Sequence, residues 1–222
     1  MVRFGGRRWV ALVLACFFGS GCGASDVTPS ATNEQCASRF ATSVVSFMAG
    51  PGPSVGQADL PEIVLGPPKG AGDAEGSLDV ATLGNGGSIT LGFDPSAIVD
   101  GPGPDFIVFE NAFFASGDRD QPFAELATVE VSDDGTTFVG FPCTAKEAPY
   151  GSCAGWHPVY ANPDTNSIDP TDPSVAGGDA FDLADVGVPR ARYVRITDRV
   201  DQTGLAGSFD LDAVSIVHAE CP

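Results

Sequence analysis

The sequence predicts an all-β fold, a β-sandwich built from many short strands. Short apolar runs recur along the chain, and several of them alternate apolar and polar residues with a period of two. No stretch after the leader shows the sustained 3.6-residue periodicity of a helix. Gly and Pro, 28 and 18 residues, fall between the runs, where they mark turns. Many short strands separated by turns are typical of a sandwich or barrel.

The expected strands are the apolar runs themselves. Ile89, Leu91 and Phe93 share one face of their run, which is the pattern of a half-buried strand. Asp133-Asp134-Gly135 follows another run and predicts a hairpin turn, because Asp and Gly tolerate a positive φ. The runs are 42–47, 63–65, 78–83, 88–93, 106–109, 126–131, 137–141, 193–196 and 209–217.

Two segments do not follow this pattern. Residues 34–47 could hold one short helix instead of a strand. Residues 144–179 are rich in Pro and Asp and contain few apolar pairs, so we expect a long excursion at one end of the domain. Long loops of this kind are usually functional or held by a disulfide.

The first residues predict export. Arg3, Arg7 and Arg8 precede the apolar run 9–18, and small residues follow it. A charged start, a short apolar stretch and a small-residue end describe a secretory signal, here 1–21. The run is too short to span a bilayer as a stable helix.

The residues that follow resemble a lipid-attachment site. Gly19-Ser20-Gly21-Cys22 is similar to a bacterial lipobox, which implies cleavage before Cys22 and its modification by lipid. Gly23 is not the Asp of an inner-membrane retention signal, so we expect an outer-membrane or cell-surface lipoprotein. Residues 22–33 would form a flexible tether and 34–222 a single β-sandwich domain. The alternative is an ordinary cleaved signal that leaves Cys22 unmodified.

The charge of the chain excludes some partners. The formal net charge is −18, and the leader contributes three arginines and no acid, so the acidity belongs to the exported domain. An acidic protein is repelled by nucleic acid and by anionic membrane surfaces. We therefore expect no nucleic-acid partner, and membrane contact only through the N-terminal lipid. With 43% hydrophobic and 18% charged residues, the chain can form a sizeable core.

Four cysteines of the exported domain predict two disulfides, which allow three pairings. Cys143 and Cys153 flank a short segment and predict a stapled loop. Cys36 and Cys221 lie near the two ends of the domain, where a disulfide would close a very long loop. We favour these two pairs. Zinc-ligand spacing is missing, because there is no CxxC motif.

Two sequence segments resemble a known family. Residues 127–138 read ATVEVSDDGTTF and residues 191–196 read ARYVRI, similar to a hairpin and a downstream strand of the discoidin or galactose-binding-like jelly roll. The resemblance implies a jelly-roll sandwich and says little about the ligand. A wider set of segments is similar to uncharacterised bacterial cell-surface proteins, which brings no known activity. These segments are 64–68, 83–89, 105–113 and 209–214.

Three carboxylates interrupt apolar strand faces and need a counter-charge. Glu110 continues a strand with two apolar faces, and Asp210 and Asp212 begin another. An unpaired buried carboxylate is costly, so each needs a cation, an Arg or several N–H donors. For Glu110 the ordinary partner would be Arg192 or Arg195. The alternative is Ca²⁺, whose ligands are carboxylate and carbonyl oxygens, and the family resemblance also implies a structural Ca²⁺ near the chain ends.

Three aromatic residues beside the stapled loop predict a binding surface. Tyr150, Trp156 and Tyr160 lie in a region with little core-like periodicity. Exposed aromatic rings offer flat faces to a sugar ring or to a protein partner. Trp156 could equally pack under the loop as a small core. Carbohydrate and protein ligands are not separated by the sequence.

Catalytic motifs are weak. Gly52-Pro53-Ser54-Val55-Gly56 matches G-x-S-x-G, but that motif requires a strand, a sharp turn and then a helix. Pro53 and Pro61 leave no room for such a helix, so we interpret the segment as a loop. The sequence thus predicts a non-enzymatic cell-surface lipoprotein that binds a glycan or a surface protein and is stabilised by calcium. The alternatives are a purely structural envelope protein and, far behind, a secreted serine hydrolase.

Overall fold

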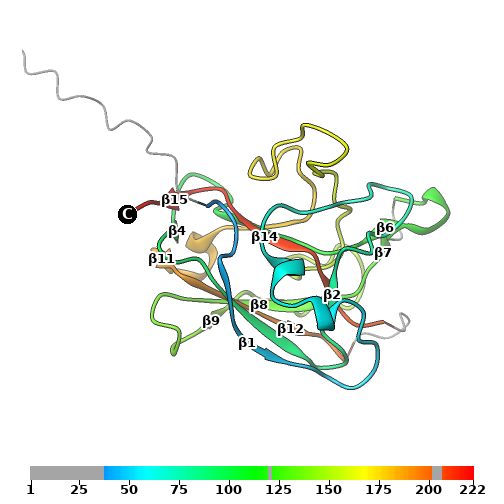
Figure 1. Cartoon of the computed structure of the whole chain (residues 1–222), viewed down its shortest axis with the longest axis horizontal. Coiled ribbons are helices and arrows are strands. Elements are labelled where there is room, and N and C mark those ends of the chain that lie inside the picture. The colour runs from blue at the N-terminus through cyan, green and yellow to red at the C-terminus, as the bar shows by residue number, and fades with distance from the viewer. Residues whose placement is uncertain (1–37, 120–121, 202–206) are drawn as a thin grey trace, which may run out of the picture. The chain divides into compact units, whose positions relative to one another are not determined.

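The computed structural model describes residues 38–119, 122–201 and 207–222 (Figure 1). These residues form short antiparallel strands and a few short 3-10 helices, so the predicted all-β class is confirmed. The predicted signal, the lipidation site Cys22, the tether and Cys36 lie outside the described residues. None of the helices in the described ranges is long and apolar enough to cross a membrane.

The largest sheet is antiparallel and has five strands. Ile196 in its central strand lies opposite Ile89 on one side and Val129 on the other, and all three side chains are fully buried. Their alternation with more exposed neighbours follows from the pleat, which sends successive side chains to opposite faces. The strand order is β1 (Ser43–Met48), β3 (Ser88–Gly92), β12 (Tyr193–Asp198), β8 (Ala127–Ser132) and β9 (Val139–Gly140).

The remaining strands form smaller antiparallel sheets. β5 (Phe106–Phe109) is central in a three-stranded sheet, between β10 (Asp179–Phe181) and β14 (Ala213–Ile216). A second three-stranded sheet and two pairs complete the set. They are β11 (Arg190–Ala191), β4 (Ala97–Val99) and β15 (Ala219–Glu220); β13 (Asp210–Leu211) with β2 (Ala81–Thr82); and β6 (Phe113–Phe114) with β7 (Pro122–Phe123). The 3-10 helices are η1 (Gln57–Asp59), η2 (Glu62–Val64), η3 (Ala115–Gly117) and η4 (Leu183–Val186).

One core joins the five-stranded sheet to the sheet of β5. Apolar residues of β3, β8 and β12 pack in the same buried cluster as Phe106 and Val108 of β5. The other face of β5, Ile107 and Phe109, packs in a second cluster under the segment that contains Val159 and Ala176. An apolar run without alternation is typical of a strand that is buried on both faces. The predicted excursion therefore covers the outer face of β5.

The predicted hairpin between β8 and β9 is confirmed. Asp134 Oδ1 accepts the backbone N–H groups of Thr136 at 2.8 Å and Thr137 at 2.7 Å. Gly135 has a φ of 73°, which a residue with a side chain rarely adopts. These local bonds close the turn and set the register of Val131 opposite Val139.

Three predicted elements differ from the structure. Residues 63–65 overlap the 3-10 helix η2, because Val64 N–H bonds back to the carbonyl of Pro61. The described part of 34–47 contains β1 and no helix. The predicted strand 209–217 is divided at Asp212, since β13 pairs with β2 whereas β14 pairs with β5. The change of partner separates Asp210 from the strand that follows it.

Candidate functional site

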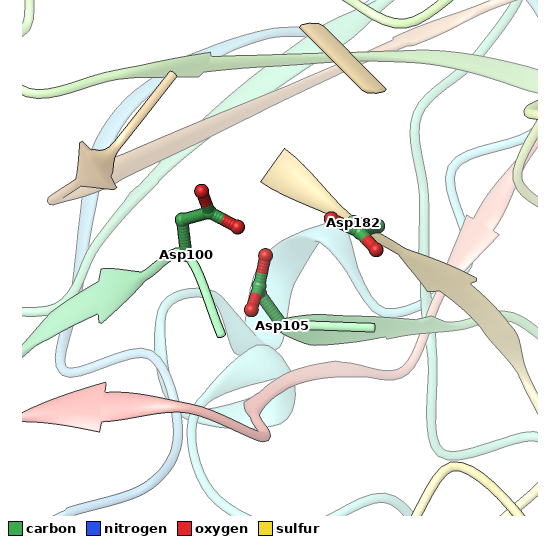
Figure 2. Close-up of side chains that lie close together, drawn as sticks. All are labelled: Asp100, Asp105 and Asp182. Carbon is green, nitrogen blue, oxygen red and sulfur yellow. The ribbon is translucent and has the colours of Figure 1, made fainter. Parts of the chain in front are cut away.

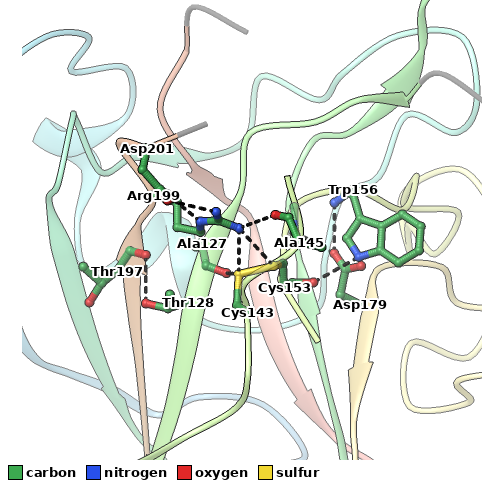
Figure 3. Close-up of a disulfide and its surroundings, with 11 residues drawn as sticks. Ala127, Thr128, Cys143, Ala145, Cys153, Trp156, Asp179, Thr197, Arg199 and Asp201 are labelled. Carbon is green, nitrogen blue, oxygen red and sulfur yellow. Dashed lines mark hydrogen bonds and ion pairs between the residues drawn. A yellow bond between two sulfur atoms is a disulfide. The ribbon is translucent and has the colours of Figure 1, made fainter. Parts of the chain in front are cut away.

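The stapled loop is present. Cys143 and Cys153 form a disulfide, and Cys221 is also disulfide-bonded, while its predicted partner Cys36 lies outside the described residues. Arg199, which follows β12, donates from Nη1 to the carbonyl of Ala145 inside the loop at 2.8 Å (Figure 3). The disulfide and this guanidinium together hold the loop against the end of the five-stranded sheet.

The predicted aromatic residues divide into two places. Tyr150 and Trp156 are half-buried, and their rings meet edge to face at 5.8 Å beside Cys153. The indole Nε1 of Trp156 donates to the carbonyl of Cys153 at 3.1 Å (Figure 3). Tyr160 has a different neighbour, since its hydroxyl donates to Asp73 Oδ1 at 2.6 Å. Trp156 therefore does pack on a small core, but this packing uses only part of its surface.

The rest of the Trp156 surface lines a hollow of about 450 Å³. A second hollow of about 460 Å³ adjoins it, because both are lined by Phe114, Arg119 and His157, and Tyr160 lines the second. The residues of the first hollow are Phe114, Arg119, Pro122, Ala148, Pro149, Trp156 and His157. Trp156 and Tyr160 thus belong to one surface although their side chains do not meet in one cluster.

Asp179, the first residue of β10, fixes the backbone that carries Trp156. Its buried carboxylate accepts the N–H groups of Gly155 at 2.6 Å and Trp156 at 3.1 Å on Oδ2. Its Oδ1 lies 2.7 Å from Nδ1 of His157. Because β10 pairs with β5, these bonds tie the wall of the hollow to a central strand.

Phe114 and Arg119 are among the residues of the hollow that were not singled out in the sequence. Phe114 and Arg119 come from the segment around β6 and η3, and the guanidinium lies over the Phe114 ring at 5.3 Å. Arg119 also forms an ion pair with Asp73, the residue that accepts from Tyr160. Nothing in their spacing points to Trp156, because the approach of the two segments depends on tertiary packing.

Glu110, directly after β5, is the most unusual carboxylate of the molecule. It is 1% exposed, and neither carboxylate oxygen has a hydrogen-bond partner among the described residues. Burial, followed by the negative charges of Glu125 and Asp210, raises the pKa of Glu110 well above its usual value. The adjacent Asn111 N–H lowers this pKa, but it does not reach hydrogen-bond geometry with either oxygen.

The two arginines considered for Glu110 are engaged elsewhere, so that expectation was wrong. Arg195 forms a bidentate pair with Glu130 on the neighbouring strand β8, at 2.6 and 2.8 Å. Arg192 pairs with Asp133 in the hairpin and with Asp94. The Arg195–Glu130 pair follows from the register of β12 against β8, and no cationic side chain of the described residues pairs with Glu110.

Of the other two predicted acids, the structure brings only Asp210 to Glu110. Asp210 Oδ2 accepts from Asn111 Nδ2 at 3.1 Å. Its Oδ1 is buried without a hydrogen bond of good geometry from the described residues, although the nearby Thr82 hydroxyl lowers the pKa of Asp210. Both carboxylate oxygens of Asp212 accept from the backbone N–H of Lys69, with the nitrogen 3.1 Å from Oδ1 and 2.9 Å from Oδ2. Burial, with a smaller contribution from the charge of Asp79, raises the pKa of Asp212 to about 8.

A separate acidic group could hold a metal ion. One ligand oxygen from each of Asp100, Asp105 and Asp182 lies within 4.8 Å of the others (Figure 2). Asp105 is fully buried, and its oxygens already accept the N–H groups of Gly101 and Leu183 at 2.8 and 2.7 Å. The sequence did not point to this group, because Asp100 and Asp105 share the loop between β4 and β5 whereas Asp182 follows β10, far along the chain.

The G-x-S-x-G segment lies in an exposed turn. Ser54 is exposed, and η1, which follows, has three residues, so the helix that a nucleophile elbow requires is not formed there. No protein-family model matches the sequence, and no curated protein is similar to it.

Proposed function

We propose that the chain is an exported, non-enzymatic carbohydrate-binding domain with a galactose-binding-like jelly-roll fold, held at the cell surface by a lipid on Cys22. The observation that carries the binding proposal is the hollow of about 450 Å³ lined by Trp156. Its size falls within the range of small-ligand sites.

The chemistry of the hollow suits a sugar. The indole of Trp156 is held in place by its bond to Cys153 and by contact with Tyr150, so little conformational entropy is lost when a ligand stacks on it. Arg119 and His157 supply N–H donors beside that ring, and sugar hydroxyls accept such bonds. Flat apolar surface next to a few polar groups is the usual composition of a ligand site.

The fold is consistent with the jelly-roll part of the proposal. Two antiparallel sheets contribute to one core, and the hairpin after Ser132 has the turn that the family resemblance implies. Loops at the end of a rigid sandwich are a common place for binding residues. The hollow lies among loops, and Asp179 ties the one that carries Trp156 to β10.

The test is a glycan array probed with the processed chain, with Trp156→Ala and with Phe138→Ala. Phe138 is a matched control, because it is a half-buried aromatic residue on the β8–β9 hairpin, where Arg195 stacks on it. We expect Trp156→Ala to weaken glycan binding at least about tenfold and Phe138→Ala to leave it unchanged. An array without signal, as for a purely structural envelope protein, or a signal that survives Trp156→Ala would contradict the proposal.

A further inference from the structure

The hollow that Trp156 lines continues into a second one. The two hollows, of about 450 and 460 Å³, share Phe114, Arg119 and His157 as walls, and of these two only the second is lined by Tyr160. Each has the size of a site for one small ligand. Both are open to solvent, so a ligand that fills one can extend into the other and beyond.

The floor of the second hollow belongs to a strand that the covering segment leaves bare. Ile107 of β5 and Ala180 of β10 lie opposite each other, so their side chains share one face of the sheet. Ile107 is fully buried and packs with Val159 of the covering segment, whereas Ala180 is exposed and lines the second hollow. The second hollow therefore has a rigid floor, because β10 is paired along β5.

Tyr160 gives the second hollow an aromatic wall that is already fixed. Its hydroxyl donates to Asp73 Oδ1 at 2.6 Å. Its ring lies against the backbone of Gly177, where a Cβ would come within 3.0 Å of the ring atom Cδ2. A fixed ring loses little conformational entropy when a ligand packs on it. The second hollow thus offers a sugar the same kind of surface that Trp156 offers in the first.

The charges beside the two hollows do not favour an anionic ligand. The guanidinium of Arg119 pairs with Asp73, and Nδ1 of His157 lies 2.7 Å from Oδ1 of the buried Asp179. These four groups together carry no net positive charge, whether or not His157 is protonated. The whole chain is acidic, with a formal net charge of −18, so it repels chains of uronic acids or sulfated sugars.

We propose that the two hollows together bind an uncharged polysaccharide along its length, with one stretch of sugars on Trp156 and the next over Ala180 beside Tyr160. The inference rests on the proposed binding of a sugar by the first hollow, and it adds the class of glycan, a neutral polymer instead of a single terminal sugar. Arg119 and His157 lie at the junction, where their polar groups can bond to hydroxyls of either stretch. Two joined stretches bind more tightly than one, because the second binds at a high effective concentration.

The first measurement is affinity electrophoresis of the processed chain in native gels. Some gels contain a neutral polymer, which is soluble galactan, glucomannan or mixed-linkage β-glucan, and others contain an acidic one, polygalacturonate or alginate. We expect at least one neutral polymer to retard the chain and neither acidic polymer to do so. Retardation by an acidic polymer, or by no polymer, would overturn the proposal.

The second measurement is calorimetric titration with the disaccharide and the hexasaccharide of the neutral polymer that retards the chain. Ala180→Ile fills part of the second hollow from an exposed position on the edge strand β10. Ser46→Ile is its matched control, because Ser46 is exposed on the edge strand β1 and lines neither hollow. We expect wild type and Ser46→Ile to bind the hexasaccharide at least about tenfold more tightly than the disaccharide. Ala180→Ile should keep the affinity for the disaccharide and lose this gain.

Trp156→Ala separates this inference from the proposed function. We expect it to weaken the binding of both sugars at least about tenfold, because the first hollow takes part in both. Disaccharide binding and an unchanged thermal midpoint show that Ala180→Ile is folded. If Ala180→Ile keeps the full gain for the hexasaccharide, the second hollow does not bind the chain and the inference is wrong, while sugar binding at Trp156 stands. Undiminished binding of both sugars by Trp156→Ala would instead contradict the proposed function.

Discussion

Arg199 Nη1 donates to the carbonyl oxygen of Ala145 at 2.8 Å, across the loop closed by Cys143 and Cys153. The side chain of Arg199 is only 7% exposed, and its Nε also pairs with Asp201 at 2.8 Å. The guanidinium is therefore a buried connector between the end of β12 and the stapled loop (Figure 3). The guanidinium spreads its Nε and Nη1 donors in a fixed planar fork toward the two partners, a geometry that the single terminal nitrogen of an ammonium does not reproduce.

We expect Arg199→Lys to lower the free energy of unfolding by about 1 to 3 kcal/mol, because the buried guanidinium gives up at least one of its charge-assisted hydrogen bonds. Urea denaturation with the disulfide intact measures this change. Arg119→Lys is the control, since Arg119 is 68% exposed and its ion pair with Asp73 faces solvent. Equal losses of stability in the two variants would contradict the assigned role of Arg199.

The sequence predicts the half-buried strands well and their pairing less well. β3, β8 and β12 were predicted because burial on one face produces alternation that is visible in a single segment. The division of 209–217 at Asp212 was not predicted. It arises because β13 pairs with β2 whereas β14 pairs with β5. Pairing between distant segments leaves no periodic signal in either one.

The same limit applies to the candidate sites. Glu110 and Asp210 were found because a carboxylate in an apolar strand pattern is locally anomalous. Glu125, whose charge raises the pKa of Glu110, was not found, because its approach depends on the fold around β13. Trp156 was found because it is close to the stapled loop in the sequence. Its partners across the hollow were missed because they come from a segment that approaches Trp156 only in the folded chain.

Asp212 provides a prediction about pH. Its pKa in the folded chain is about 8, raised from 3.8 mainly by burial. The folded state therefore holds this proton at pH values where the unfolded state has released it. The contribution of this bound proton to the stability of the folded state is fully present below about pH 4 and is lost as pH rises toward about 8. Glu125, with a pKa of about 7, acts in the same direction.

We expect Asp212→Asn to stabilise the calcium-free chain by about 2 to 5 kcal/mol above pH 8 and to have little effect near pH 4. The Asn Oδ1 can still accept from the N–H of Lys69, so the loss of charge is the principal change. Urea denaturation in EGTA across this range measures the slope. Asp185→Asn is the control, because Asp185 is exposed. Parallel pH profiles for wild type and Asp212→Asn would show that the buried carboxylate is not the cause.

Asp179 gives a prediction about the mobility of the hollow that Trp156 lines. Its carboxylate accepts from the N–H groups of Gly155 and Trp156 and lies 2.7 Å from Nδ1 of His157. In Asp179→Asn, the side-chain amide can accept with only one oxygen and carries no charge, so these charge-assisted bonds weaken. We expect a loss of about 2 to 3 kcal/mol in stability and a more mobile backbone at 155–157.

Trp156 itself reports this change. The chain has two tryptophans, and the other, Trp9, lies in the predicted leader, so the fluorescence of the processed chain comes from Trp156. We expect Asp179→Asn to increase acrylamide quenching of that fluorescence. Asp105→Asn is the matched control, because Asp105 is also a buried acceptor of two backbone N–H groups, from Gly101 and Leu183. It should lose comparable stability without a change in quenching, and an equal rise in both variants would point to general loosening of the fold rather than release of the Trp156 wall.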